Sequence, residues 1–121
     1  MATIDTAKYF TKAKDLSSNA GGASGDIIYT CPANFISLIK FLHVSSGASG
    51  AKKYSLQWYE AATTTYHFII DEHSVGANGI EEVVEGGAYL ALAAGDKIIG
   101  FEETSSDFHV IISGEEHFQT A

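Results

Sequence analysis

The chain has 121 residues, of which 45% are hydrophobic, and it carries a net charge of −8 with no arginine. This length suits one domain with a substantial core. An acidic chain without arginine is a poor match for nucleic acid, because neutralisation of phosphates drives that binding. No apolar stretch is long enough to span a bilayer, residues 1–10 lack the features of a signal peptide, and the single cysteine, Cys31, excludes a disulfide framework. We expect Cys31 to be a buried hydrophobe in a protein made in a reducing cytoplasm.

The first 25 residues differ in composition from the rest. Residues 2–16 combine three lysines with scattered apolar residues, which predicts a short helix or a loose arm. Residues 17–25 are rich in Ser, Ala and Gly, which predicts a flexible linker. We therefore expect an N-terminal arm and linker over residues 1–25 and one folded domain over residues 26–121.

The remainder of the chain predicts about eight short strands separated by Gly-rich turns. Apolar residues alternate with polar ones in most of these segments, and no strand–helix alternation indicates a parallel sheet. The expected strands are 26–31, 35–46, 53–61, 64–73, 80–84, 89–93, 97–103 and 108–113, with residues 115–121 as a tail. The pattern favours an all-β fold, a single-domain antiparallel β-sandwich that is an eight-stranded jelly roll.

Two of these segments predict which side chains face the core. In 53–61 the alternation places Tyr54, Leu56 and Trp58 on the core face and Tyr59 on the opposite face. Segment 35–46 is apolar on both faces, which indicates a central strand or one covered on both sides. Strict alternation assigns its apolar residues to two sets, with Ile36, Leu38, Leu42 and Val44 on one face and Phe35, Ile39 and Phe41 on the other.

Four motifs resemble a pattern of small tailed-bacteriophage virion proteins of jelly-roll type. They are Tyr29-Thr30-Cys31-Pro32-Ala33, the long strand from Ile36 to Ser45, Leu92-Ala93-Ala94-Gly95-Asp96-Lys97-Ile98, and the segment Val110 to Glu116. The resemblance implies a capsid cement (decoration) protein, or a tail or fibre component. Cement proteins of this type look like jelly rolls that cluster on the outer shell, often as trimers, with an N-terminal arm that reaches neighbouring subunits.

The titratable residues do not form a catalytic pattern. His67 and His73 share a strand face, but no His-x-His pair exists, which argues against a cupin-type enzyme. Acidic residues that are adjacent in sequence point to opposite faces of a strand, so they do not form a carboxylate couple. The Gly-rich turns lack the Gly-Lys-Ser/Thr ending of a phosphate-binding loop. We expect no enzyme activity, no catalytic residue, no cofactor and no metal.

The expected function is a capsid cement protein on the exterior of the virion, made in the host cytoplasm. Its partners would be the major capsid protein and copies of itself in a homotrimer, without nucleic acid or membrane. The expected partner-binding residues are Lys8, Tyr9, Phe10, Lys12, Lys14, Tyr59 and Thr64. Three alternatives remain open: a tail, fibre or baseplate component that binds host glycan through an aromatic platform at Tyr59 and Tyr66, a free carbohydrate-binding module, and a degenerate cupin-like enzyme.

Overall fold

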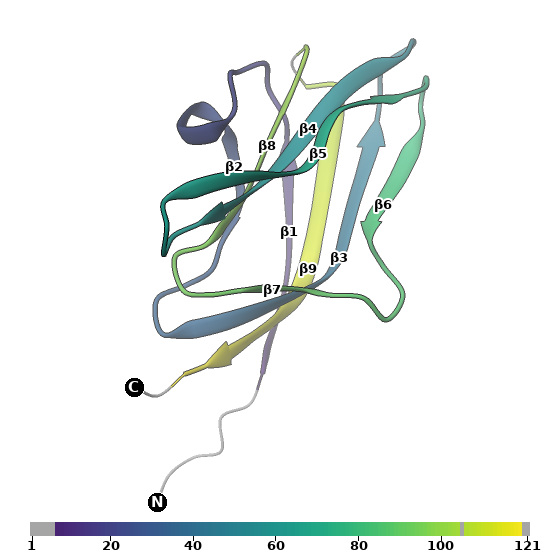
Figure 1. Ribbon diagram of the computed structural model, residues 1–121. Coiled ribbons are helices and arrows are strands. Elements are labelled where there is room, and N and C mark those ends of the chain that lie inside the picture. Colours follow the sequence, from purple (N-terminus) through teal and green to yellow (C-terminus); the bar gives the residue numbers. More distant parts are fainter. Residues whose placement is uncertain (1–6, 105, 120–121) are drawn as a thin grey trace, which may run out of the picture.

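The computed structural model describes residues 7–104 and 106–119, and within them the protein is built almost entirely of strands (Figure 1). No helix in these residues is long and apolar enough to cross a membrane. The elements are β1 (Lys8–Asp15), the short 3-10 helix η1 (Gly22–Ser24), β2 (Asp26–Thr30), β3 (Phe35–Ser46), β4 (Lys52–Glu60), β5 (Thr65–Val75), β6 (Ile80–Val84), β7 (Leu90–Leu92), β8 (Lys97–Glu102) and β9 (Phe108–Phe118). The predicted all-β class is confirmed.

The strands form two antiparallel sheets packed as a sandwich. The first sheet has the order β1-β9-β3-β6, with β7 also paired to β3, and the second has the order β2-β8-β4-β5. The first strand pairs with the last, β2 with β8, β3 with β6 and β7, and β4 with β5. This nested pairing is a long double-stranded ribbon that is rolled up by the β3–β9 and β4–β8 contacts, which is the topology of a jelly roll (Figure 1).

The described residues form nine strands rather than the expected eight, and the additional strand is β1, since β6 and β7 were already predicted as the two segments 80–84 and 89–93. The partner of β3 is interrupted between Val84 and Leu90, so one jelly-roll strand is divided into β6 and β7. The segment predicted as an arm supplies β1, which pairs with β9 from Lys8 to Asp15. The predicted helix or loose arm is therefore wrong for residues 8–15, while residues 2–6 lie outside the described residues. The predicted tail of residues 115–121 is wrong for residues 115–118, because β9 continues to Phe118 and pairs with β1, while residues 120–121 lie outside the described residues.

Residues 17–25 are an ordered strap that lies on the outer face of the second sheet. The Ser17 N–H and hydroxyl both donate to the Asp26 carboxylate, at 2.6 and 2.8 Å, and the Gly22 N–H donates to Gln57 Oε1 at 2.7 Å. A methyl group added to Gly25 would lie 2.2 Å from Ile99 Cγ2. The glycine composition that predicts flexibility instead permits close contact with the sheet, so the flexible-linker prediction is wrong.

A β-bulge changes which residues of β3 face the core. The pairing of β3 with β9 shifts between Ile39 and Phe41, so the alternation of side chains reverses there. Ile39 and Leu42 both lie fully buried between the sheets, whereas strict alternation placed them on opposite faces. The rest of the core follows the sequence prediction more closely and includes Tyr54, Leu56, Phe108, Val110 and Ile112.

Candidate binding surfaces

The outer face of the first sheet carries several exposed hydrophobic side chains. Tyr9 is 80% exposed, Ile80 66%, Tyr89 61% and Ile111 38%. The register places Tyr9 opposite Glu115 and Ile111 opposite His43, all pointing away from the core. We call this surface, with the partly exposed Phe41, the open face. Several exposed apolar side chains on the outer face of one sheet are typical of an interaction site.

Charged side chains on the open face are paired with one another. Lys40 Nζ lies 2.9 Å from Glu115 Oε2, and His109 Nδ1 lies 2.6 Å from Asp15 Oδ1. The Lys40 ammonium and the His117 imidazole lower the pKa of Glu115, and Glu115 raises the pKa of Lys40. His43 forms a further pair with Glu82. Aromatic residues beside the Lys40–Glu115 ion pair and the histidine–carboxylate contacts form a composition that suits contact with another protein.

The outer face of the second sheet has an aromatic cluster beside the strap. The rings of Tyr59 and Tyr66 are 4.7 Å apart, and Lys97 Nζ lies 5.3 Å from the centre of the Tyr59 ring. Phe68 and Phe101 make an edge contact at 6.4 Å. The structure therefore brings together Tyr59 and Tyr66, as the sequence predicted, but the strap covers part of the same face.

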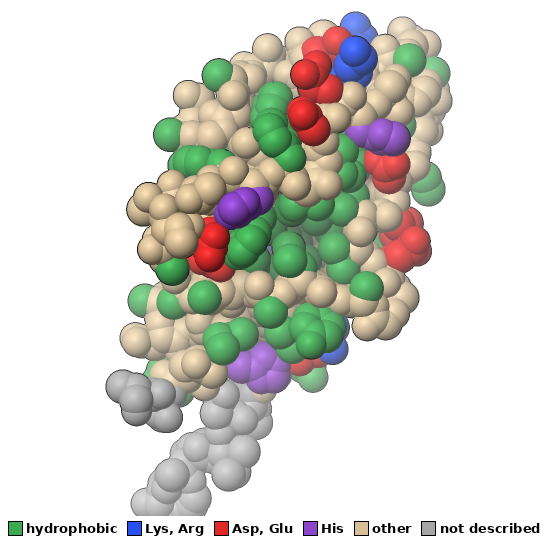
Figure 2. All heavy atoms as spheres, viewed as in Figure 1, with side chains coloured by type: hydrophobic (Ala, Val, Ile, Leu, Met, Phe, Trp, Pro, Cys, Tyr) green, Lys and Arg blue, Asp and Glu red, His purple; other side chains and the backbone are tan. Residues whose placement is uncertain are grey.

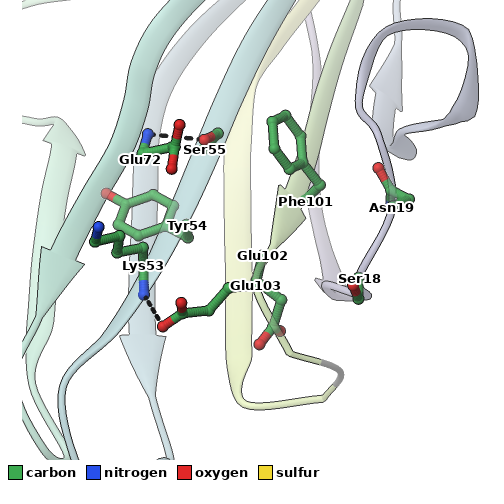
Figure 3. Close-up of a pocket in the computed structure, with 9 residues that line it drawn as sticks. All are labelled: Ser18, Asn19, Lys53, Tyr54, Ser55, Glu72, Phe101, Glu102 and Glu103. Carbon is green, nitrogen blue, oxygen red and sulfur yellow. Dashed lines mark hydrogen bonds between the residues drawn. The ribbon is translucent and has the colours of Figure 1, made fainter.

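A small cavity of about 190 Å³ lies where the strap meets β4 and β8 (Figure 3). Its polar groups are used within the protein: Glu103 accepts from the Lys53 N–H at 3.1 Å, and Ser55 Oγ accepts from the Glu72 N–H at 2.8 Å. The Glu102 carboxylate is 2% exposed and accepts from the Phe108 N–H, and burial raises its pKa. These hydrogen bonds join β4 to β5 and β8 to β9, so they fit a structural role for the cavity rather than a ligand site.

The lysines and aromatic residues predicted in the arm do not form one surface. Phe10 stacks on Tyr29 at 4.4 Å inside the sandwich, so its side chain is occupied. Lys8 Nζ lies 5.3 Å from the centre of the Phe35 ring. Lys12 and Lys14 are exposed and lie on the same side of β1 as Phe10, at the edge of the sandwich.

The other predicted residues lie apart from these. Tyr9 alone belongs to the open face. Tyr59 and Thr64 lie at the β4–β5 end of the second sheet, where Thr64 occupies an exposed turn with a φ of 52°. The predicted binding residues are thus divided between the two sheets. Most of the open face was missed, although the apolar character of both faces of 35–46 was a signal for it.

A groove of about 300 Å³ opens between the sheets near β7 and the β4–β5 turn. Figure 2 shows hydrophobic side chains gathered in a recess on the viewed face. Trp58 lines the groove and is only partly buried, so its prediction as a core residue is wrong in part. The groove is lined by Ile36, Trp58, Glu60, Ala62, Ala91, Leu92, Ala93 and Asp96.

The histidines and the cysteine do not assemble into a reactive centre. Within residues 7–104 and 106–119, no group of three or more His, Cys, Asp or Glu side chains is placed to hold a metal ion. Each of the five histidines lies beside a carboxylate instead. Cys31 is 1% exposed, as expected, and burial raises the pKa of its thiol.

Comparison of the chain with protein-family models, with curated proteins and with solved structures finds no match.

Proposed function

We propose that this protein is a non-enzymatic structural component of a bacteriophage particle, and first a capsid cement protein that binds the outer shell through its open face. The observation that carries the proposal is the open face itself, where Tyr9, Tyr89 and Ile111 are exposed around the paired Lys40 and Glu115. Burial of exposed apolar groups and tyrosines of this kind by a partner lowers the free energy of the complex.

The jelly roll would act as a rigid plug. Its open face would lie against subunits of the major capsid protein, and contacts between copies of the chain would join neighbouring sites. Each interface needs only modest affinity, because many copies bound to one shell act together through avidity. The charge pairs on the face need not be broken when the partner binds, which limits the cost of desolvation.

The position of β1 changes how the N-terminal segment would contribute. Residues 8–15 are part of the sheet, so they would not reach out as a separate arm. Lys12 and Lys14 are exposed along this edge strand, and lysines at a sheet edge discourage pairing with a strand of another chain. Docking through the open face is therefore favoured over extension of the sheet.

Paired substitutions on the two sheets test the proposal. We expect Tyr9→Ser combined with Ile111→Ser to reduce binding to shells that lack the protein by at least about tenfold, because each site loses buried apolar area. Phe68→Ser is the matched control, since Phe68 is 51% exposed on the second sheet. Equal binding by both variants and the wild type would overturn the role of the open face.

The copy number separates cement from a tail component. Quantitative mass spectrometry of purified particles should give a count comparable with that of the major shell protein. A copy number sufficient for only a few rings per particle would indicate a component of the neck or tail. Absence of the protein from particles would refute a virion role.

A further inference from the structure

We infer that the groove beside Trp58 is a binding site for one neutral sugar ring. The groove is on the inner side of β4, away from the Tyr59 cluster, and it is separate from the open face. Its binding activity does not depend on the proposed function and can be measured on the isolated protein.

The indole of Trp58 is held rigidly at the groove. Its Nε1–H donates to Asp96 Oδ2 at 3.2 Å, and the His67 ring stacks on it at a centroid distance of 4.9 Å and an angle of 27°. A fixed aromatic surface loses little conformational entropy when a ligand packs on it. The His67 ring covers one face of the indole, so a ligand in the groove would pack against the part of the indole that remains exposed.

Asp96 positions the site and is not free to bind a ligand. Its carboxylate is 4% exposed and accepts from the N–H groups of Ala61 and Ala93, each at 3.0 Å, as well as from Trp58. These bonds fix β7, the β4–β5 turn and the indole relative to one another. The groove is thus pre-formed, as small-ligand sites usually are.

Glu60 supplies the polar contact. Its Oε1 accepts from the Thr63 hydroxyl at 3.0 Å and from His67 Nε2–H at 3.1 Å. Its Oε2 takes part in neither bond, and Glu60 lines the groove. An oriented carboxylate oxygen beside an aromatic ring is suited to accept a hydrogen bond from a ligand hydroxyl.

The size and charge of the groove select the ligand class. A volume of about 300 Å³ is at the lower end for small-molecule sites and suits a single ring. The lining contains two carboxylates and no lysine, so it disfavours anions. Asp96 and Glu60 Oε1 already accept from donors within the protein, which weakens the attraction for a simple cation and leaves Glu60 Oε2 for a ligand hydroxyl. A neutral sugar offers C–H groups for the negative face of the indole and hydroxyls for Glu60.

Tryptophan fluorescence reports on this groove alone, because Trp58 is the one tryptophan of the chain. The purified protein is titrated with methyl glycosides of neutral hexoses, and with glucuronate and tetramethylammonium as charged probes. We expect at least one neutral glycoside to shift the emission with saturation, and both charged probes to have no effect.

Two variants and one control locate the site. Glu60→Gln should weaken the binding by about tenfold or more, because a charged acceptor is lost. Ala62→Phe should block the groove without touching the core, since Ala62 is in an exposed turn. Phe68→Ala is the control on the outer face of the second sheet and should bind normally. The inference is overturned if no neutral glycoside binds, if tetramethylammonium binds in preference, or if Ala62→Phe leaves binding intact.

Discussion

The outer faces of both sheets carry apolar side chains, but only that of the second sheet is partly covered by another described segment of the chain. On the second sheet, the strap of residues 17–25 packs on Ile99 and Phe101 and is tied to Asp26 and Gln57. The open face of the first sheet has no such cover within the described residues. The chain thus covers part of one sheet with its own backbone, and it leaves the apolar side chains of the open face exposed.

Glycine residues allow the strap to pack closely on the outer face of the second sheet. Gly21 has a φ of 73°, and a methyl group there would lie 2.5 Å from Phe101 Cε1, so the strap touches the sheet through backbone atoms. The open face instead carries long side chains, such as Tyr9, Lys40 and Tyr89, which keep a neighbouring backbone at a distance. A partner of the open face must therefore match these side chains.

The largest expected effect comes from the centre of the first sheet, which supports the open face. A Cβ at Gly114 would lie 2.0 Å from the Leu38 carbonyl oxygen, where no flexible side chain can yield. We expect Gly114→Ala to lower the free energy of unfolding by about 3 kcal/mol. Urea unfolding measures this, with Gly50→Ala as the control, because nothing lies within 4 Å of that position. Equal stability of the two variants would contradict the packing.

Loss of the hydrogen bonds that hold the strap should expose the outer face of the second sheet, as the open face of the first sheet is exposed. Asp26→Ala removes the acceptor for the Ser17 N–H and hydroxyl and for Asn19 Nδ2. We expect a loss of about 2 kcal/mol and a gain in binding of a hydrophobic dye, because Phe101 and Ile99 become exposed. Asp71→Ala, at an exposed position, is the control. A strap that stays protected from hydrogen exchange in Asp26→Ala would refute the tether.

Two glutamates should respond to pH with opposite signs. Burial raises the pKa of Glu102 in the second sheet, so its contribution to stability is present below about pH 4 and is lost as pH rises through the raised pKa. Lys40 and His117 lower the pKa of Glu115 on the open face, so its contribution is present above about pH 4 and is lost as pH falls through the lowered pKa.

The measurement is the free energy of unfolding from pH 3 to pH 7 for Glu102→Gln and Glu115→Gln. As pH rises, the free energy of unfolding of Glu102→Gln should increase relative to that of the wild type. The free energy of unfolding of Glu115→Gln should decrease relative to that of the wild type. The Glu115 effect should be the smallest, because the Lys40–Glu115 pair is on the surface. Parallel pH profiles for the two variants would contradict the difference between the faces.

The sequence pattern was sufficient to predict the regular strands. It was insufficient for features that depend on strand register or on tertiary contacts. The boundaries of β3 and β6 agree with the segments 35–46 and 80–84, because Pro, Asn and Gly turn residues mark their ends. The bulge after Ile39 could not be foreseen, since it depends on how β9 pairs with β3. The groove was missed because alternation shows that Trp58 points inward but not that the sheets separate there.

The sequence by itself determined the all-β class, the sandwich, and the burial of residues such as Leu56, Phe108 and Ile112, because side-chain alternation and turn residues act locally. The tertiary structure decided that residues 8–15 form β1, that the glycine segment is a strap, and that Tyr9, Tyr89 and Ile111 share one face. These features join residues distant along the chain, and the free energy of such contacts is not encoded in any local pattern.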